Sequence, residues 1–340
     1  MHGMKWMFNA RSAARLSALL ITALVVLSCT VAVGQVGDDL MFSTEEEFIT
    51  QGPTPADGNP IISDGDLLDA QCQVYARNAD LLKPFGLAVD LGLDAADVLD
   101  KDTYLVAFST EQDSPLAGQF TAGDLLITNG AVVPNVALLW AHGQQSGYTP
   151  EVDLGLDAVH FLGEAENIER CLQQIALIPR QAWILAPGQL SETLRRHEID
   201  IWFSVEGTQR MSSIPLLDGD LVSAAYGGIP RGNGQLLPPS VPAGVPSRGV
   251  DFGLDAYTAK ERGIETPPEL GWFSTEILFL GAPAFTDGDL LQVSTGAIIC
   301  VNSQLLVCFE PRAMFLGLDA LTIPMVFPSV TRSPGTQRSP

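Results

Sequence analysis

Asp153-Leu154-Gly155-Leu156-Asp157-Ala158 decides the fold, because nearly the same six residues recur at 90–95, 251–256 and, altered, at 315–320. Three shorter motifs precede each copy in a constant order: Phe-Ser-Thr/Val-Glu, then Gly-Asp-Leu-Leu/Val, then Asn-x-x-Leu-Leu. Agreement among four copies of one chain is internal repetition. It indicates that one supersecondary unit is stacked four times.

Each copy contains short apolar runs rich in Val, Ile, Phe and Tyr, bounded by Gly, Asp, Asn and Pro. Such runs are typical of strands and are too short for helices. We expect four strands per unit: one after Leu-Asp-Ala, one ending in Phe-Ser-Thr-Glu, one at Gly-Asp-Leu-Leu, and one at the Leu-Leu after the Asn, which would form a hairpin turn. The sequence therefore predicts an all-β fold, a four-bladed β-propeller-like repeat domain over residues 35–328.

The ends of the repeat predict how the domain closes. The first copy lacks its strand after Leu-Asp-Ala, and the chain finishes with an additional strand within 318–327. We expect this C-terminal strand to complete the first blade and to remove an exposed sheet edge. A linear β-solenoid and a pair of packed sandwiches are the alternatives.

The third unit is longer than the others, because an insertion at 163–200 interrupts it. Apolar residues recur there at helical spacing, which predicts an amphipathic helix, and 190–196 is a candidate second helix. The periodic positions are Ile168, Cys171, Leu172, Ile175 and Ala176.

Residues 1–34 resemble a secretory signal, with three basic residues, an apolar run over 16–33 and a small-x-small site that predicts cleavage after Gly34. A retained membrane anchor and a lipid attached at Cys29 are the alternatives. We therefore expect a secreted or periplasmic protein with no membrane attachment once the signal is cleaved. The tail at 329–340, rich in Ser, Arg, Pro and Gly, is predicted to be disordered.

The chain is strongly acidic, with 18 Lys and Arg against 40 Asp and Glu and a net charge of −22. Removal of the signal makes the charge more negative, because 1–34 contains three basic and no acidic residues. This field repels phosphate backbones, which argues against nucleic acid, and it favours cations or basic partners. An alternative reading is that the charge only keeps an exported protein soluble.

Four cysteines follow the signal, at positions 72, 171, 300 and 308, too few for a disulfide-based scaffold. Cys300 and Cys308 flank a presumed hairpin, so we propose them as a disulfide pair. The histidines lack the spacing of a zinc site.

The tandem Phe-Ser-Thr-Glu, Gly-Asp-Leu-Leu and Gly-Leu-Asp-Ala units, over about residues 38–327, resemble those of uncharacterised secreted bacterial proteins with propeller-like repeats. The resemblance implies the architecture of a repeat protein. It implies no activity, cofactor or catalytic residue.

The acids that open the first strand of each unit are the candidate site. Pseudo-symmetry places them in a ring, and carboxylates that close together repel one another unless a cation offsets them, so calcium is the hypothesis. The structural alternative is that they accept hydrogen bonds from turn amides. These acids are Asp94, Asp157, Asp255 and Asp319, and a variant of the hypothesis uses Glu45, Glu111, Glu206 and Glu276.

No nucleophile elbow, zinc-protease motif or phosphate-binding loop occurs in the chain. We therefore expect an exported, non-catalytic repeat protein that presents an acidic binding surface to an unknown protein or glycan, with calcium as a possible stabilising ion and no other cofactor. One alternative is a secreted hydrolase, similar to glycoside hydrolases, with two rim carboxylates beneath the insertion. Another is a purely structural envelope protein.

Overall fold

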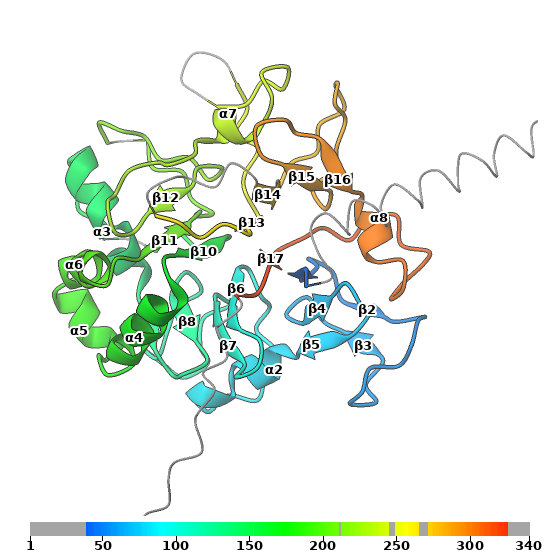
Figure 1. Cartoon of the computed structure of the whole chain (residues 1–340), viewed down its shortest axis with the longest axis horizontal. Coiled ribbons are helices and arrows are strands. Elements are labelled where there is room, and N and C mark those ends of the chain that lie inside the picture. The colour runs from blue at the N-terminus through cyan, green and yellow to red at the C-terminus, as the bar shows by residue number, and fades with distance from the viewer. Residues whose placement is uncertain (1–38, 152, 211, 245–248, 265–270, 326–340) are drawn as a thin grey trace, which may run out of the picture.

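The structure is a computed structural model that describes residues 39–325, apart from 152, 211, 245–248 and 265–270. The described chain consists mostly of small antiparallel sheets with a few helices (Figure 1). There are five sheets within these ranges, and none closes into a barrel. The fold therefore leans towards the all-β class that the sequence predicted, with helices between the strands.

Four of the sheets correspond to the four repeat units. The first contains, in spatial order, β17 (Leu321–Thr322), β1 (Met41–Phe42), β4 (Leu67–Asp69) and β5 (Val74–Ala76). The second contains β6 (Ala96–Asp100), β7 (Leu105–Phe108), β8 (Leu125–Ile127) and β9 (Val132–Val133). The third contains β10 (Val159–Leu162), β11 (Asp200–Phe203) and β12 (Val222–Ser223). The fourth contains β13 (Ala256–Ala259), β14 (Gly271–Ser274), β15 (Leu290–Gln292) and β16 (Ile298–Cys300). A separate hairpin pairs β2 (Phe48–Ile49) with β3 (Ile61–Ile62).

The first strand of each sheet contacts the first strand of the next sheet. The contacts run from β17 to β6, from β6 to β10, from β10 to β13 and from β13 back to β17. Figure 1 shows these four strands near the centre of the molecule, with the other strands of each sheet farther out. β17 pairs with β1 through Met41 with Thr322 and Phe42 with Leu321. The last described strand thus completes the sheet of the first unit, which is the pairing that the sequence predicted.

Repeated side chains join consecutive units. The phenylalanine of each Phe-Ser motif is buried in the core. In three units the serine after it donates a hydrogen bond to the corner of the next unit: Ser109 Oγ to Leu156 O at 2.7 Å, Ser204 Oγ to Leu254 O at 3.0 Å, and Ser274 Oγ to Leu318 O at 3.4 Å. Because a buried hydroxyl needs a partner, these serines tie their sheets to the next ones, whereas Ser43 Oγ of the first unit has no such bond.

The prediction of a strand at the Leu-Leu of each Asn-x-x-Leu-Leu motif is wrong. Each Asn begins a helix, and the outer strand comes before it, except in the third unit, where no fourth strand is described. Residues 135–146, where the sequence predicted a turn and a strand, form the longest helix among the described residues. The reason is that Leu at i+3 and i+4 also suits a helical turn, so a short apolar run does not distinguish the two. The helices are α2 (Asn78–Leu81), followed by the 3₁₀ turn η1 (Lys83–Phe85), α3 (Asn135–Ser146), α7 (Asn233–Leu236) and α8 (Asn302–Leu305).

The insertion in the third unit is helical, as predicted. It contains α4 (Ala165–Ile175), α5 (Arg180–Leu185) and α6 (Gly188–Arg196). Four residues of the apolar stripe that predicted α4, Ile168, Cys171, Leu172 and Ile175, are buried in the largest core cluster of the described residues, together with Trp183 of α5, and Ala176 packs against it partly buried. α5, which sequence periodicity did not indicate, is held in part by an ion pair between Arg180 and the buried Asp124.

The predicted disulfide between Cys300 and Cys308 is wrong. Cys308 pairs with Cys72, 236 residues earlier, with 5.8 Å between the two Cα atoms. Proximity in sequence did not determine the pairing, because α8 lies between the two candidate residues and Cys308 packs in a core cluster shared by the first and last units. The disulfide therefore joins the first unit to the last. Cys171 is a buried free thiol.

The predicted signal at 1–34, with Cys29, and the tail at 329–340 lie outside the described residues. Among the helices that are described, none is both long enough and apolar enough to cross a membrane.

Candidate functional site: an acidic cavity at the start of the inner strands

In each unit, the Gly-Leu-Asp-Ala corner is the turn that leads the chain into the inner strand. Its glycine has a positive φ, as at Gly155 with φ of 79°, which other residues rarely adopt. A Cβ at this glycine would also overlap the carboxylate of Glu206, from the Phe-Ser-Val-Glu motif of the same sheet. The same relation holds at the other corners, where Gly92, Gly253 and Gly317 lie against Glu111, Glu276 and Glu45. Glycine therefore gives each glutamate its place beside the corner.

The repeated Asn holds the corner in position. Asn135 donates from Nδ2 to Gly155 O at 2.8 Å and accepts from Leu154 N at 3.1 Å. Asn78 and Asn302 make the equivalent pairs of bonds with the corners at 91–92 and 316–317. The Asn thus acts as a bridge between two loops rather than as the hairpin residue that the sequence predicted.

The Asp of each Gly-Asp motif has a structural role. Asp124 accepts from Thr121 N at 3.1 Å and from Asn135 N at 3.1 Å, so both of its oxygens are used. Asp66, Asp220 and Asp289 do the same in their own units. These four aspartates therefore cap turn amides, which is the role that the sequence offered as the alternative for the corner aspartates.

The four corner aspartates behave differently. Asp94, Asp157, Asp255 and Asp319 line one cavity of about 300 Å³, together with Glu206 and Glu276. In each of the four, Oδ2 is buried and has no hydrogen-bond partner. Asp157 is 7% exposed and Asp255 is 8% exposed. The four corner aspartates, which pseudo-symmetry predicted to lie together, thus line one cavity, and these oxygens do not cap backbone amides.

Burial and mutual repulsion raise the pKa values of these acids. Burial, with the charges of Glu206 and Glu111, raises the pKa of Asp94 to about 8. Burial is also the main cause that raises the pKa values of Asp157, Asp255 and Asp319 well above the usual range, with neighbouring carboxylates adding to it. The pKa values of the glutamates at 45, 111 and 276 rise to about 7 for the same reasons. The site favours neutral carboxyl groups or a bound positive charge.

Two of the four glutamates of the alternative set lie at the same cavity as the corner aspartates. Glu206 and Glu276 line the cavity itself, whereas Glu45 and Glu111 stand beside the corners at 317 and 92 without lining it. Within the described ranges, none of these eight carboxylates has a Lys or Arg ion-pair partner. Nor are any three His, Cys, Asp or Glu side chains of this part of the chain already grouped so that they could hold a metal ion.

A buried network of hydrogen bonds around one ion pair joins the inner strands farther along their length. The sequence did not predict this network. Asp97 accepts two bonds from Arg262, at 2.7 and 2.8 Å, and one from Thr322 Oγ1 at 3.0 Å. Arg262 also donates to Phe161 O and Ile323 O. Burial opposes the charge on Asp97, but Arg262 outweighs it and lowers the pKa of Asp97. One arginine thus ties together segments of all four main sheets.

The sequence contained one indication of this network, a position of the repeat that is polar in every copy. The residue three places after each corner aspartate is polar in all four copies and buried in all four: Asp97, His160, Thr258 and Thr322. Burial and the nearby Arg262 lower the pKa of His160 to about 3, so its ring is neutral. Because the partner Arg262 lies outside any repeated motif, the sequence could not supply it.

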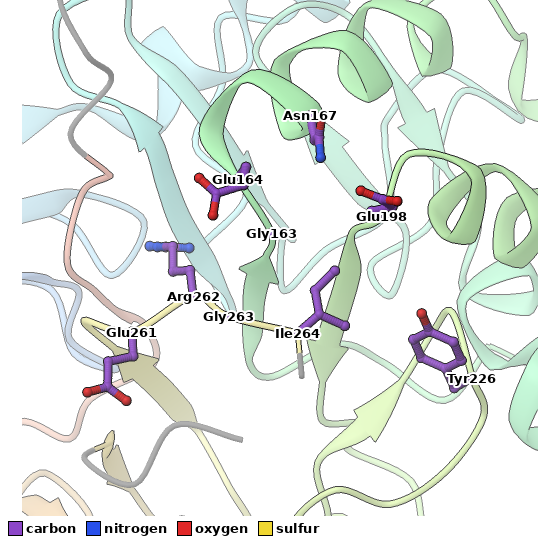
Figure 2. Close-up of a pocket in the computed structure, with 9 residues that line it drawn as sticks. All are labelled: Gly163, Glu164, Asn167, Glu198, Tyr226, Glu261, Arg262, Gly263 and Ile264. Atoms are coloured by element: carbon purple, nitrogen blue, oxygen red, sulfur yellow. The ribbon is translucent and has the colours of Figure 1, made fainter. Parts of the chain in front are cut away.

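A second pocket, of about 780 Å³, lies at the far end of the inner strands, where β10 and β13 end. Glu164 and Glu198, at the two ends of the insertion, line it together with Glu261. Figure 2 shows these three carboxylates standing apart around the pocket rather than converging on one point. Arg262, which also lines the pocket, is engaged by Asp97. The insertion therefore does border a pocket, as the hydrolase alternative requires, but without a converging acid pair.

Comparison of the chain with protein-family models, with curated proteins and with solved structures found no match. The functional argument therefore depends on the chain's own geometry.

Proposed function

We propose that this protein is an exported, non-catalytic repeat protein that binds positively charged ligands at the acidic end of a four-bladed β-propeller. One observation carries the proposal. Four corner aspartates from four repeat units line one cavity, and their buried Oδ2 atoms have no partner. Buried carboxylates without partners cost free energy, so a protein that repeats them four times gains from a ligand that offsets their charge.

The propeller assignment is part of the proposal. It is supported by the cyclic contacts of the four inner strands and by the pairing of β17 with β1. It is further supported by the antiparallel order of each sheet outward from its inner strand. In such an arrangement the inner strands share one direction, so all four corners meet at one end of the axis.

The acidic end extends beyond the cavity. Burial, together with the neighbouring carboxylate of Asp251, raises the pKa of Asp218 to about 8. Asp64 lies close to Asp90 and Glu111, and burial with the charge of Asp90 raises its pKa as well. A positively charged partner would therefore meet further carboxylates around the cavity mouth. This supports a binding surface at that end.

A hydrolase is the second candidate, and the pocket at the far end of the strands is the observation that favours it. Glycoside hydrolysis needs an acid and a base or nucleophile on either side of the bond that is cleaved. Glu164 and Glu198 are the residues placed to attempt this chemistry. A purely structural envelope protein, the third candidate, predicts no ligand at either end.

The experiment is a titration of the protein comprising residues 35–340 with a hexalysine peptide, followed by calorimetry in about 20 mM and about 500 mM salt. We expect binding that weakens strongly at the higher salt concentration and no binding of hexaglutamate. A protein that binds neither peptide at low salt contradicts the proposal. Hydrolysis of a panel of glycosides that is lost in Glu164→Gln would instead support the hydrolase.

A further inference from the structure

We infer that the axial cavity is a metal site that takes one hydrated divalent cation, calcium by its chemistry, on the Oδ2 atoms of the four corner aspartates. The inference deepens the proposed function, on which it rests, by naming the ligand class of the deepest part of the acidic end.

The first step concerns the unsatisfied oxygens. Asp157 and Asp255 are more than nine-tenths buried, line the cavity, and have Oδ2 atoms without a hydrogen-bond donor. The equivalent aspartates of the Gly-Asp motifs, such as Asp124, have both oxygens satisfied by backbone amides. The chain therefore satisfies buried aspartates where they are structural. Oxygens left without donors at four equivalent positions indicate a partner from outside the chain.

The second step concerns the donor atoms. The six side chains that line the cavity are all carboxylates. An all-oxygen, anionic donor set is the one preferred by calcium and magnesium, whereas zinc and copper prefer sites with nitrogen or sulfur. The ligand class is therefore a hard divalent cation.

The third step concerns size. The cavity of about 300 Å³ is far larger than a bare ion, and no three of the described acids are already grouped for direct chelation. Water molecules occupy roughly 30 Å³ each, so the cavity has room for an ion with several of its waters. Calcium accepts six to eight oxygens in flexible geometry, while magnesium demands a close octahedron. A wide ring supplemented by water thus favours calcium over magnesium.

The fourth step concerns symmetry. Each of the four units contributes one aspartate, and Asp319 comes from the corner that leads into β17. A single ion among all four would contact every unit. Glu206 and Glu276, which also line the cavity, come from the third and fourth units and would make the coordination unequal. Glu45 and Glu111 occupy the same motif position but do not line the cavity, which makes them matched controls.

The test is calorimetric titration of the protein comprising residues 35–340 with calcium chloride and, separately, with magnesium chloride. We expect one calcium per chain and weaker binding of magnesium. The double variant Asp157→Asn/Asp255→Asn should weaken calcium binding at least about 100-fold, because it removes two of the four charged ligands. Glu206→Gln/Glu276→Gln should weaken binding about tenfold, and Glu45→Gln/Glu111→Gln by less than about threefold.

Circular dichroism and the melting temperature of each variant without calcium show whether it folds. Asn for Asp removes repulsion, so the aspartate variant should melt at or above the wild-type temperature in the absence of metal. A wild-type protein that binds no calcium, or an aspartate variant that binds it as tightly as wild type, overturns the metal site. Binding of hexalysine in those cases leaves the proposed function standing, and loss of both refutes both.

Discussion

Substitution of Arg262 by methionine tests the buried network that joins the four sheets. The Arg262 side chain is 7% exposed and Asp97 is 1% exposed, and the substitution removes two bonds to Asp97 and two to backbone carbonyls. Loss of one partner of a buried ion pair costs about 3–5 kcal/mol, because the other charge is left without compensation. With an unfolding entropy of about 2 cal/mol/K per residue, this corresponds to a melting temperature about 5–8 °C lower.

The assay is thermal unfolding followed by circular dichroism, with chemical denaturation for the free energy. Lys83→Met is the matched control, because Lys83 forms an exposed pair with Asp80 and its loss should cost less than about 1 kcal/mol. Asp97→Asn/Arg262→Met should be less destabilised than the sum of the single variants, since the pair is removed together. A melting temperature of Arg262→Met within 1 °C of wild type would refute the argument.

Three further predictions follow from the cavity and the repeat. Without metal, the melting temperature should fall as pH rises from about 5 to 8, because the folded-state pKa values of Asp94 and Glu276 lie near 8 and 7. The stability that these groups contribute is fully present below their unfolded-state pKa values of about 4, and it is lost as pH rises through their folded-state pKa values. Saturating calcium should reduce this fall, and a melting temperature that does not change with pH in the absence of metal would contradict the prediction. Cys72→Ser/Cys308→Ser should lower the free energy of unfolding by about 2–5 kcal/mol, measured in denaturant, and an unchanged midpoint would show that the bond does not constrain the unfolded chain. Gly155→Ala should lower the free energy of unfolding by about 1–3 kcal/mol more than Gly118→Ala. Both glycines have a positive φ, but only at Gly155 would the Cβ meet a neighbouring carboxylate. Equal melting temperatures of the two variants would contradict the role of that contact.

The repeat is what the sequence by itself determined about this protein. Motifs repeated in a fixed order located the four sheets, the glycine corners and the insertion, because each unit forms its strands and turns from residues close together in the chain. Pseudo-symmetry was also enough to predict that Asp94, Asp157, Asp255 and Asp319, which line one cavity, lie together. Local periodicity was less reliable at the Asn motif, where helix and strand share the same short apolar pattern, so α3 was predicted as a strand.

Tertiary structure alone decided the contacts between segments that are distant in the chain and belong to no repeat. The partner of Cys308 is Cys72 because the ends of the chain meet, and nearness in sequence says nothing of that. Arg262 lies in an unrepeated loop, yet it contacts Asp97, 165 residues earlier. The absence of hydrogen-bond donors to Oδ2 of the four corner aspartates could also not be predicted from their motif. The aspartates of the Gly-Asp motifs look similar in sequence to the corner aspartates, yet both of their oxygens accept hydrogen bonds. Burial and bonding depend on which loops fold over a residue, and only the assembled sheets fix that.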